Sequence, residues 1–251
     1  MATQRPHLVF LHGLLGTKAD WQKIIEKLPH FPCVALDLPF HGENKQLAAK
    51  DFAQSAEILS AQIQSAVQNQ PYFLIGYSLG GRLALYYALQ AEVKKGNLQG
   101  LILEGANLGL TCEQERQQRW QNDCDWADRF ATQPAHQVLE DWYQQHVFSH
   151  LTAEQRQALI QLRQANCGEN IAQMLKATSL AKQPDFRPQV RSNSLPIFYL
   201  CGENDSKFHQ MAVENELNLH LIPNAGHNAH QENPQGFAEC LQKILTKIEI
   251  N

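Results

Sequence analysis

Short apolar runs recur along the chain and predict β-strands. Their residues are nearly all apolar rather than alternating with polar ones, which is typical of strands buried on both faces of a sheet. The runs are HLVFLHG (7–13), CVALDLP (33–39), YFLIGYS (72–78), LQGLILEGA (98–106), PIFYLCGE (196–203) and NLHLIPNAGH (218–227). Stretches with helical spacing separate most of them, such as 51–68 and 81–93. This alternation predicts an α/β fold, a mostly parallel sheet with helices on both faces.

One long region interrupts this alternation. From about residue 111 to 191 the pattern is helical and rich in Gln, Arg and Trp, with no convincing strand. The region is too long for a loop in a compact domain, so it predicts a helical insertion that covers one edge of the sheet. We call residues 111–191 the cap segment. The expected organisation is a core made of residues 1–110 and 192–251, with the cap segment inserted between them.

Composition narrows the setting of this fold. The 251 residues are 43% apolar and 18% charged, as in an ordinary folded protein, and the net charge of −4 gives no reason to expect nucleic acid or an anionic membrane as a partner. The apolar run near the N-terminus is too short for a signal peptide or a membrane-spanning helix. The six cysteines form no C-x-x-C pair, so we expect neither a zinc site nor a disulfide scaffold, and a reduced, cytoplasmic setting.

The stretch GYSLGGR contains the first candidate for chemistry, Ser78. It follows an expected strand, precedes an expected helix and lies between Gly76 and Gly80. A serine at such a sharp turn adopts a strained backbone, and small residues two positions away on each side let the turn close. The helix N-terminus behind the serine favours developing negative charge. The pattern predicts a nucleophile elbow rather than an incidental serine in a glycine-rich turn.

A serine of this kind needs a base and a carboxylate that orients the base, in the chain order Ser, Asp or Glu, His. Asp205 lies a few residues beyond the strand in 196–203, where this architecture places the acid, and Glu203 is the alternative. Asp205 could instead simply cap the following helix. His227 follows the last strand and a turn, so we predict that it is the base, whereas His230 points elsewhere.

The turn after the first strand, in FLHGLLG, predicts an oxyanion hole. The backbone N–H groups of Leu14 and Leu79 would form it. Histidine pairs such as His146 and His150 could bind a metal in principle, but no carboxylate–histidine pattern supports one, so no metal is expected.

Arg82 is unusual because a cation on the first turn of a helix opposes the helix dipole. It is either a solvated surface residue or an anion ligand.

Several segments together resemble a known family. HGLLG, DLPFHG, GYSLGGR, DWYQQ, YLCGENDSKF and NAGHNAHQENP are similar to the α/β-hydrolase-fold enzymes of menaquinone biosynthesis, the 2-succinyl-6-hydroxy-2,4-cyclohexadiene-1-carboxylate synthases. The likeness runs from about residue 9 to 245. Phe40 stands where the family usually has glycine, which alters a loop but no proposed catalytic group.

The resemblance implies a lyase that uses a Ser-His-Asp triad for proton abstraction and expels pyruvate from a substrate with three carboxylates. It implies no cofactor. It also implies anion-binding roles for Arg82, Arg119 and Arg163, with Tyr77 and Trp142 lining the pocket. The transfer to Arg119 competes with Arg116, one helical turn away. The partner would be a small anionic molecule; the sequence does not determine an oligomeric state.

Two other functions are compatible with these residues. A carboxylesterase or thioesterase would use the same triad through an acyl-serine intermediate, but it would not need three arginines in one pocket. A binding module on a hydrolase fold usually lacks a member of the triad, whereas serine, aspartate and histidine are all present here in order.

Overall fold

The core of the protein is one six-stranded parallel sheet. The computed structural model describes residues 5–249. The strand order is β2-β1-β3-β4-β5-β6, and every neighbouring pair is parallel. The strands are β1 (His7–Leu11), β2 (Cys33–Leu36), β3 (Tyr72–Tyr77), β4 (Leu98–Glu104), β5 (Ile197–Gly202) and β6 (Asn218–Ile222). All six predicted strands and the predicted α/β class are therefore confirmed.

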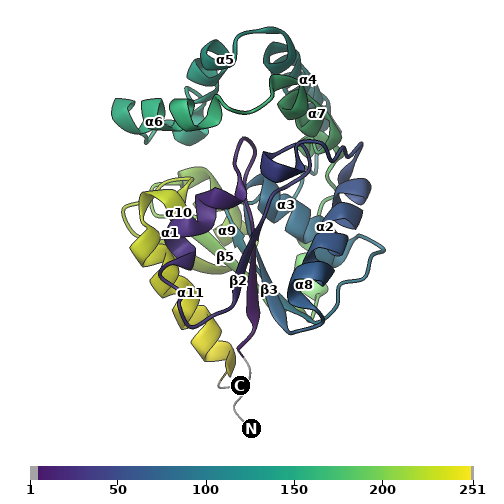
Figure 1. Cartoon of the computed structure of the whole chain (residues 1–251), viewed down its shortest axis with the longest axis vertical. Helices are drawn as coiled ribbons and strands as arrows, with labels where there is room; N and C mark the ends of the chain where they lie inside the picture. Colours follow the sequence, from purple (N-terminus) through teal and green to yellow (C-terminus); the bar gives the residue numbers. More distant parts are fainter. Residues whose placement is uncertain (1–4, 250–251) are drawn as a thin grey trace.

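Both faces of the sheet are buried, as the uninterrupted apolar runs predicted. Successive strand residues alternate between two apolar clusters: Val9 and Leu11 belong to one, Leu8 and Phe10 to the other. The first cluster packs against α2 (Phe52–Val67) and α3 (Leu79–Leu89), and the second packs against α1 (Gln22–Ile25) and α11 (Pro234–Glu249). Figure 1 shows α1 and α11 on one side of the strands and α2 and α3 on the other.

Short elements follow the carboxyl ends of four strands. The 3₁₀ turns η1 (Lys18–Trp21) and η2 (Gly42–Asn44) follow β1 and β2, and the helices α9 (Ser206–Glu214) and α10 (Ala229–Glu232) follow β5 and β6. The helix predicted in 51–68 is confirmed, since Asp51 caps α2 by accepting the N–H of Gln54 at 2.8 Å.

The cap segment contains helices and no strand. Its elements are α4 (Glu113–Thr132), α5 (Ala135–Trp142), η3 (His146–Phe148), α6 (Ala153–Arg163), α7 (Gly168–Ala177), η4 (Leu180–Lys182) and α8 (Arg187–Ser192). Helices α4 to α7 lie beyond one end of the strands, while α8 lies beside the sheet (Figure 1). A third apolar cluster, which includes Phe130, Leu139 and Ile160, lies within this layer. The boundaries of the cap segment as a separate unit stay a prediction.

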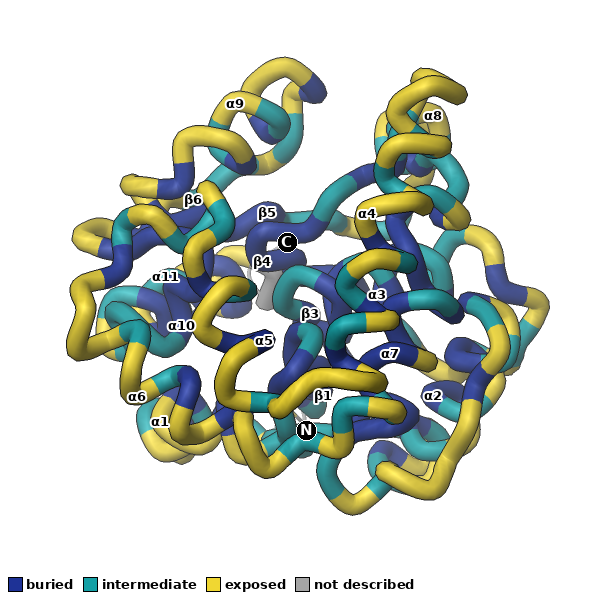
Figure 2. Tube along the Cα trace, turned by 90° about the horizontal axis from the view of Figure 1, so that it is seen from above, coloured by how far each residue is buried: buried dark blue, intermediate teal, exposed yellow. Residues whose placement is uncertain are grey.

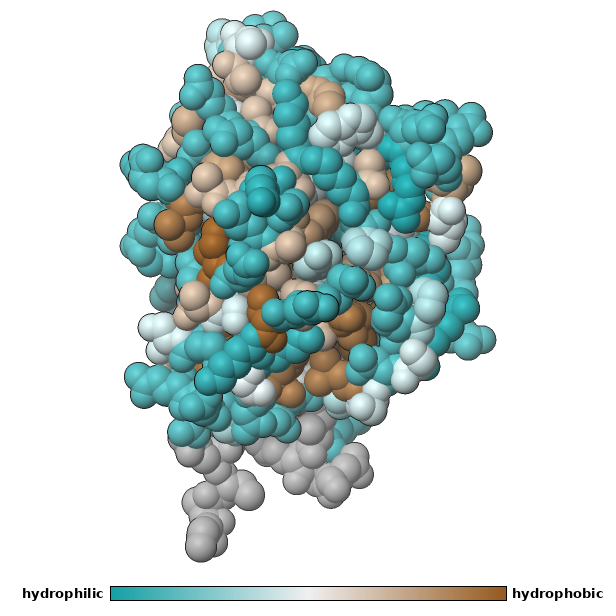
Figure 3. Space-filling view, turned by 90° about the vertical axis from the view of Figure 1, so that its right-hand side faces the viewer, coloured by the Kyte–Doolittle hydropathy of each residue, from teal (hydrophilic) through white to brown (hydrophobic). Residues whose placement is uncertain are grey.

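The surface is mainly polar. Viewed from above, buried strands at the centre are surrounded by helices whose outer sides are exposed (Figure 2). On the face drawn in Figure 3, apolar side chains are scattered among hydrophilic ones. Within residues 5–249, no helix has the length and apolar character needed to cross a bilayer.

Candidate active site

Ser78 connects β3 to α3 through a strained turn. Its φ of 49° and ψ of −108° place a non-glycine residue in a sparsely populated backbone region. A Cβ atom at Gly76 would lie 2.6 Å from the backbone of Gly80, and one at Gly80 would lie 2.5 Å from the carbonyl oxygen of Leu11. The predicted strained turn with obligatory small neighbours is confirmed. It places the serine at the carboxyl edge of the sheet and at the start of a helix.

The structure brings together the predicted acid and base. Nδ1 of His227 lies 2.7 Å from Oδ2 of Asp205, and both side chains are 5% exposed. The other oxygen, Oδ1, accepts the N–H of Phe208 and caps α9, so capping and histidine binding use different oxygens of one carboxylate. A carboxylate accepts from an N–H, so Nδ1 carries the proton and Nε2 is the basic nitrogen. The alternative acid, Glu203, is exposed and accepts the N–H of Asn224 instead.

Aromatic rings hold the imidazole of His227 in place. The ring stacks on Phe208 with centroids 4.8 Å apart, and the rings of Tyr77 and Phe148 lie at 5.4 and 6.2 Å. Gly105, which follows β4 with a φ of 54°, leaves room for this ring: a Cβ atom there would lie 2.8 Å from Cε1 of His227. The sequence reasoning missed Gly105, although a glycine directly after a buried strand was an available signal.

His230, the other histidine near the end of the chain, has a different environment. Its backbone N–H and its Nδ1 contact the two carboxylate oxygens of Glu104 at 3.0 and 2.8 Å, and both side chains are 1% exposed. Its ring stacks on Trp21 at 4.2 Å and meets Tyr77 edge-on at 4.9 Å. This pair anchors the start of α10 to the end of β4. The sequence pattern had no signal for Glu104.

A buried histidine fixes the turn that carries the predicted oxyanion donor Leu14. Nε2 of His12 accepts the N–H of Leu38 at 3.0 Å, and Nδ1 contacts the carbonyl oxygen of Gly13 at 2.7 Å. Burial lowers the pKa of His12 to about 4, so the ring is neutral and donates from Nδ1. This bond sets the plane of the Gly13–Leu14 peptide, because the N–H of Leu14 points opposite to the Gly13 carbonyl. The second predicted donor, Leu79, is the first residue of α3, where an N–H has no acceptor within the helix.

A small cavity lies between the core and the cap segment, with a volume of about 60 Å³. Four parts of the chain line it: the turn after β1, the turn at Ser78, the cap segment and the loop that carries His227. The lining residues are Gly13, Leu14, Asp20, Tyr77, Ser78, Trp142, Tyr143, Phe148, Arg163, His227 and Asn228. Six of the ten predicted site residues therefore line this cavity. The other four, Asp205, Leu79, Arg82 and Arg119, are not among the lining residues.

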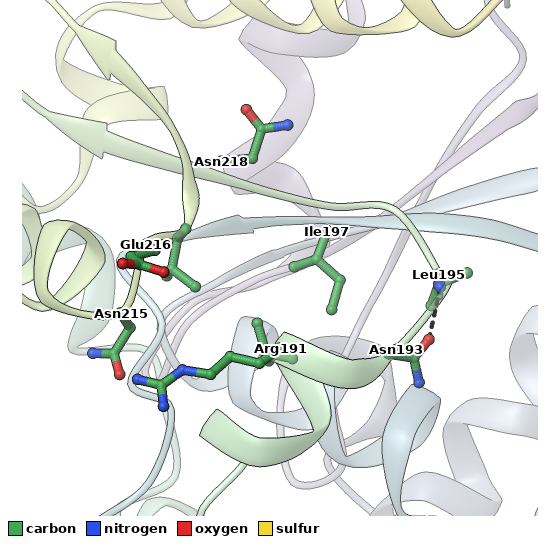
Figure 4. A pocket seen from close by; sticks show the side chains of 9 residues that line it. Arg191, Asn193, Leu195, Ile197, Asn215, Glu216 and Asn218 are labelled. Atoms are coloured by element: carbon green, nitrogen blue, oxygen red, sulfur yellow. Dashed lines mark hydrogen bonds between the residues drawn. The ribbon is translucent and has the colours of Figure 1, made fainter.

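A larger hollow of about 430 Å³ lies elsewhere, at the amino ends of β5 and β6 (Figure 4). Arg191, Asn193 and Glu216 are among its lining residues, and none of the predicted site residues is. It is separate from the chemistry at the carboxyl edge.

Arg163 reaches the cavity already paired with a carboxylate. Its Nη1 and Nη2 donate to Oδ1 and Oδ2 of Asp20 at 2.8 and 2.7 Å, and both side chains are buried. Burial alone would lower the pKa of Arg163, but the Asp20 charge and hydrogen bonds, together with Tyr143, raise it. The sequence reasoning missed Asp20 because the pair joins positions 143 residues apart. An external carboxylate could bind Arg163 only by sharing it with Asp20 or by displacing Asp20.

Arg82 and Arg119 lie near each other, and the carboxylate of Asp123 acts on both of them. Nε of Arg82 donates to Oε1 of Gln183 at 2.6 Å, and its Nη2 donates to the carbonyl oxygen of Thr178. Burial, and then the charge of Arg119, lower the pKa of Arg82, and the charge of Asp123 opposes them. Arg119 pairs with Asp123 at 2.8 Å within α4. Arg82 is partly buried, and its side-chain hydrogen bonds go to the neutral groups of Gln183 and Thr178.

The structure separates the two candidates for the second arginine. The guanidinium of Arg116 donates to the backbone carbonyl oxygens of Leu110, Ala181 and Gln183, so it ties a turn of the cap segment to the end of the preceding core segment. Arg119 has one carboxylate partner and influences Arg82 electrostatically. This arrangement favours Arg119 as the residue for an external anion, and its role stays a prediction.

With this geometry in place, comparison with known proteins identifies the class. Residues 6–234 match the family described as the alpha/beta hydrolase fold, so the chain belongs to that family. Among solved structures, the MenH structure from S. aureus superposes with a TM-score of 0.88 at 28% identity, covering 98% of this chain and 95% of that one. A thermophilic esterase from Thermogutta terrifontis, solved with malate bound, superposes at 0.80 with 21% identity, covering 97% and 90%, which shows the shared fold.

Curated relatives narrow the class to one enzyme family. The 2-succinyl-6-hydroxy-2,4-cyclohexadiene-1-carboxylate synthase of Klebsiella pneumoniae is 45% identical over 96% of this chain and 94% of its own length. A Haemophilus influenzae protein under a provisional form of that name is 60% identical over 96% of this chain and 98% of its own. The chain belongs to the family of these synthases.

Proposed function

We propose that this enzyme is a carbon–oxygen lyase of menaquinone biosynthesis. It would convert 2-succinyl-5-enolpyruvyl-6-hydroxy-3-cyclohexene-1-carboxylate to 2-succinyl-6-hydroxy-2,4-cyclohexadiene-1-carboxylate and pyruvate. The observation that carries the proposal is that Ser78, Arg163 and His227, which is paired with Asp205, line one cavity. The names of the curated relatives support the same reaction.

The proposed reaction starts with removal of the proton next to the succinyl ketone. Nε2 of His227 takes the hydroxyl proton of Ser78, and the serine oxygen takes the proton from C2 of the ring. Asp205 stabilises the resulting imidazolium through Nδ1. The negative charge moves to the ketone oxygen, where the N–H groups of Leu14 and Leu79 would hold it, as an oxyanion hole holds a tetrahedral intermediate.

Collapse of this enolate completes the elimination. A C2–C3 double bond forms, the C3–C4 double bond moves to C4–C5, and the C5–oxygen bond breaks. The leaving enolpyruvate takes up the proton that His227 received and becomes pyruvate. Serine is a base in this sequence and is never acylated, which distinguishes it from the ester hydrolysis that the same residues would support.

The substrate class follows from the cations around the site. The substrate has three carboxylates, and guanidinium groups bind carboxylates with two parallel hydrogen bonds. Because the net charge of the protein is −4, local arginines must supply the attraction. Arg163 lines the cavity, whereas Arg82 and Arg119 do not line it and would bind carboxylates that extend beyond it. Tyr77 and Trp142 would line the space for the ring.

Pyruvate release from the upstream intermediate tests the proposal. The purified protein should release one pyruvate per substrate, measured with lactate dehydrogenase and NADH, and Ser78→Ala should reduce turnover by orders of magnitude. Ser65→Ala, an exposed serine on α2, is the matched control. Unchanged turnover in Ser78→Ala would remove the serine from the mechanism, and an acyl-serine trapped by mass spectrometry would establish the esterase alternative.

A further inference from the structure

Glu104, the last residue of β4, is bonded to both of the chain segments that carry Ser78 and His227. Its carbonyl oxygen accepts the N–H of Ser78 at 2.8 Å. Its two carboxylate oxygens contact the backbone N–H and Nδ1 of His230 at 3.0 and 2.8 Å. His230 follows His227 closely in the chain, within α10. One residue therefore links the position of the serine to the position of its base.

The next residue, Gly105, extends this link to the imidazole itself. Its N–H donates to the carbonyl oxygen of Leu200 on β5 at 3.3 Å, so the end of β4 is held by the neighbouring strand. A Cβ atom at Gly105 would lie 2.8 Å from Cε1 of His227, which means that the backbone here packs directly against the ring. The end of β4 therefore contacts the serine and both histidines.

Aromatic rings connect the two histidines. His230 stacks on Trp21 with ring centroids 4.2 Å apart and meets the ring of Tyr77 at 4.9 Å. The same Tyr77 ring lies 5.4 Å from that of His227, and Tyr77 directly precedes Ser78 in the chain. A displacement of His230 would therefore move a ring that contacts the base and belongs to the residue before the serine.

The Glu104–His230 pair is buried more deeply than stability alone requires. Both side chains are 1% exposed. Replacing a buried polar or charged pair with apolar side chains of similar size is often neutral for stability, because the pair regains only part of the hydration that it loses. Removing one partner, in contrast, leaves the other unpaired and is costly. A role in the geometry of the site therefore explains this pair better than a role in stability.

We propose that Glu104 and His230 are positioning residues that set the placement of Ser78 relative to His227. Neither is among the residues that line the catalytic cavity, so they act through the Ser78 amide, the Tyr77 ring and the start of α10. All the residues of this link belong to the core. The effect on pyruvate release rests on the proposed function, whereas the effect on the reactivity of Ser78 can be measured without it.

Reaction of Ser78 with a fluorophosphonate tests the proposal without the substrate. The serine oxygen bonds to phosphorus, fluoride leaves and His227 takes up the serine proton, so the rate depends on how serine and base are placed. Glu104→Leu removes both acceptor oxygens at similar size. It should lower the second-order rate of labelling, followed by mass spectrometry, by about 10- to 100-fold. Glu104→Gln should recover most of this rate, because its amide can accept the His230 N–H and donate to Nδ1 of the other imidazole tautomer.

Two further variants distinguish placement from stability. Tyr72→Phe is the matched control, because it removes a buried hydroxyl at the opposite end of β3, where it contacts the Tyr87 hydroxyl at 2.9 Å and the Lys95 carbonyl oxygen at 2.6 Å. It should lower the free energy of unfolding in urea and leave the labelling rate unchanged. Glu104→Leu combined with His230→Phe removes both polar partners, so it should regain stability relative to Glu104→Leu but not the labelling rate. This double variant carries the test if Glu104→Leu does not fold.

Pyruvate release by the same variants tests the consequence for turnover. In Glu104→Leu, kcat should fall by about the same factor as labelling with a smaller change in KM, because a misplaced base slows the chemical step more than it weakens binding.

The outcomes separate the two proposals. The positioning role would be overturned by labelling that is unchanged in Glu104→Leu, that falls equally in Tyr72→Phe, that is as slow in Glu104→Gln as in Glu104→Leu, or that is restored in the double variant. A wild-type protein that is labelled at Ser78 but releases no pyruvate would refute the proposed function, while the labelling rates would still decide the positioning role.

Discussion

Replacing Arg82 with methionine should lower kcat/KM for the tricarboxylate substrate but change the free energy of unfolding only slightly. The guanidinium is partly buried and donates to Gln183 and to the carbonyl oxygen of Thr178, and it lies 5.5 Å above the ring of Phe52. Burial and the neighbouring Arg119 lower its pKa, which means that the fold holds this charge at a cost. Such a charge is suited to a carboxylate that arrives with the substrate.

The expected effects differ in size. Loss of one charge-assisted pair with a substrate carboxylate should cost about 2–4 kcal/mol, on the order of 30- to 1000-fold in kcat/KM. The free energy of unfolding should change by less than about 1 kcal/mol. In Arg82→Met the lost hydrogen bonds, roughly 1 kcal/mol each, are offset by removal of a buried charge that faces Arg119, while the methionine keeps apolar contact with Phe52.

Three measurements check this reasoning. They are pyruvate release over a range of substrate concentrations, hydrolysis of a small neutral ester, and urea denaturation of the same preparations. Arg82→Lys should recover activity only in part, because it restores the charge but not the two-pronged donor. An equal loss with the tricarboxylate and the neutral ester, or an unchanged kcat/KM for the tricarboxylate, would refute the role of Arg82 as a substrate ligand.

Three further predictions follow from single contacts. Gly105→Ala should lower kcat by at least about 100-fold, because the added methyl group displaces the ring of His227; near-normal turnover would contradict the required fit. Arg116→Ala should lower the free energy of unfolding by about 1–3 kcal/mol, measured in urea, since it leaves three backbone carbonyls without their donor. His150 pairs with Glu232 at 2.9 Å, and the pKa of His150 is raised while that of Glu232 is lowered. The contribution of His150 to the free energy of unfolding is complete below pH 6.5 and is lost as pH rises through its raised pKa, whereas the contribution of Glu232 is complete above pH 4.5. The stability difference between wild type and His150→Ala should therefore be largest between these values and shrink at higher pH; a difference independent of pH would refute an ionic link.

Sequence pattern predicted those features that depend on local spacing. The six strands follow from apolar runs that must be buried on both faces of a sheet. The strained turn at Ser78 follows from its two glycines, and the Asp205–His227 pair follows from the order in which strand ends appear at one edge of a parallel sheet. In each case, one local rule leaves few alternatives.

The residues that sequence reasoning missed act across long separations. Asp20 meets Arg163 143 residues away, and Glu104 meets His230 126 residues away. A carboxylate in a strand end or a short turn has no pattern that names its partner, because the partner is set by how the cap segment or α10 packs in three dimensions. Sequence reasoning also left open the choice between Arg116 and Arg119. That choice depends on which of the two guanidinium groups is already bound to backbone carbonyl oxygens, and only the folded structure shows this.

The core and the cap segment contribute different groups to the candidate site, which explains how a hydrolase fold can catalyse an elimination. The core supplies Ser78, His227 and the candidate oxyanion donors, and none of these distinguishes an enolate from a tetrahedral intermediate, since both place negative charge on one oxygen. Selection for a tricarboxylate must come from charge, and two of the three candidate arginines, Arg119 and Arg163, belong to the cap segment. Asp20 neutralises the charge of Arg163 at the cavity. A substrate carboxylate could take the place of Asp20, so that the arginine need not be buried without a partner. If the proposed arginine roles hold, what the cap segment binds, more than the triad, decides between hydrolysis and elimination.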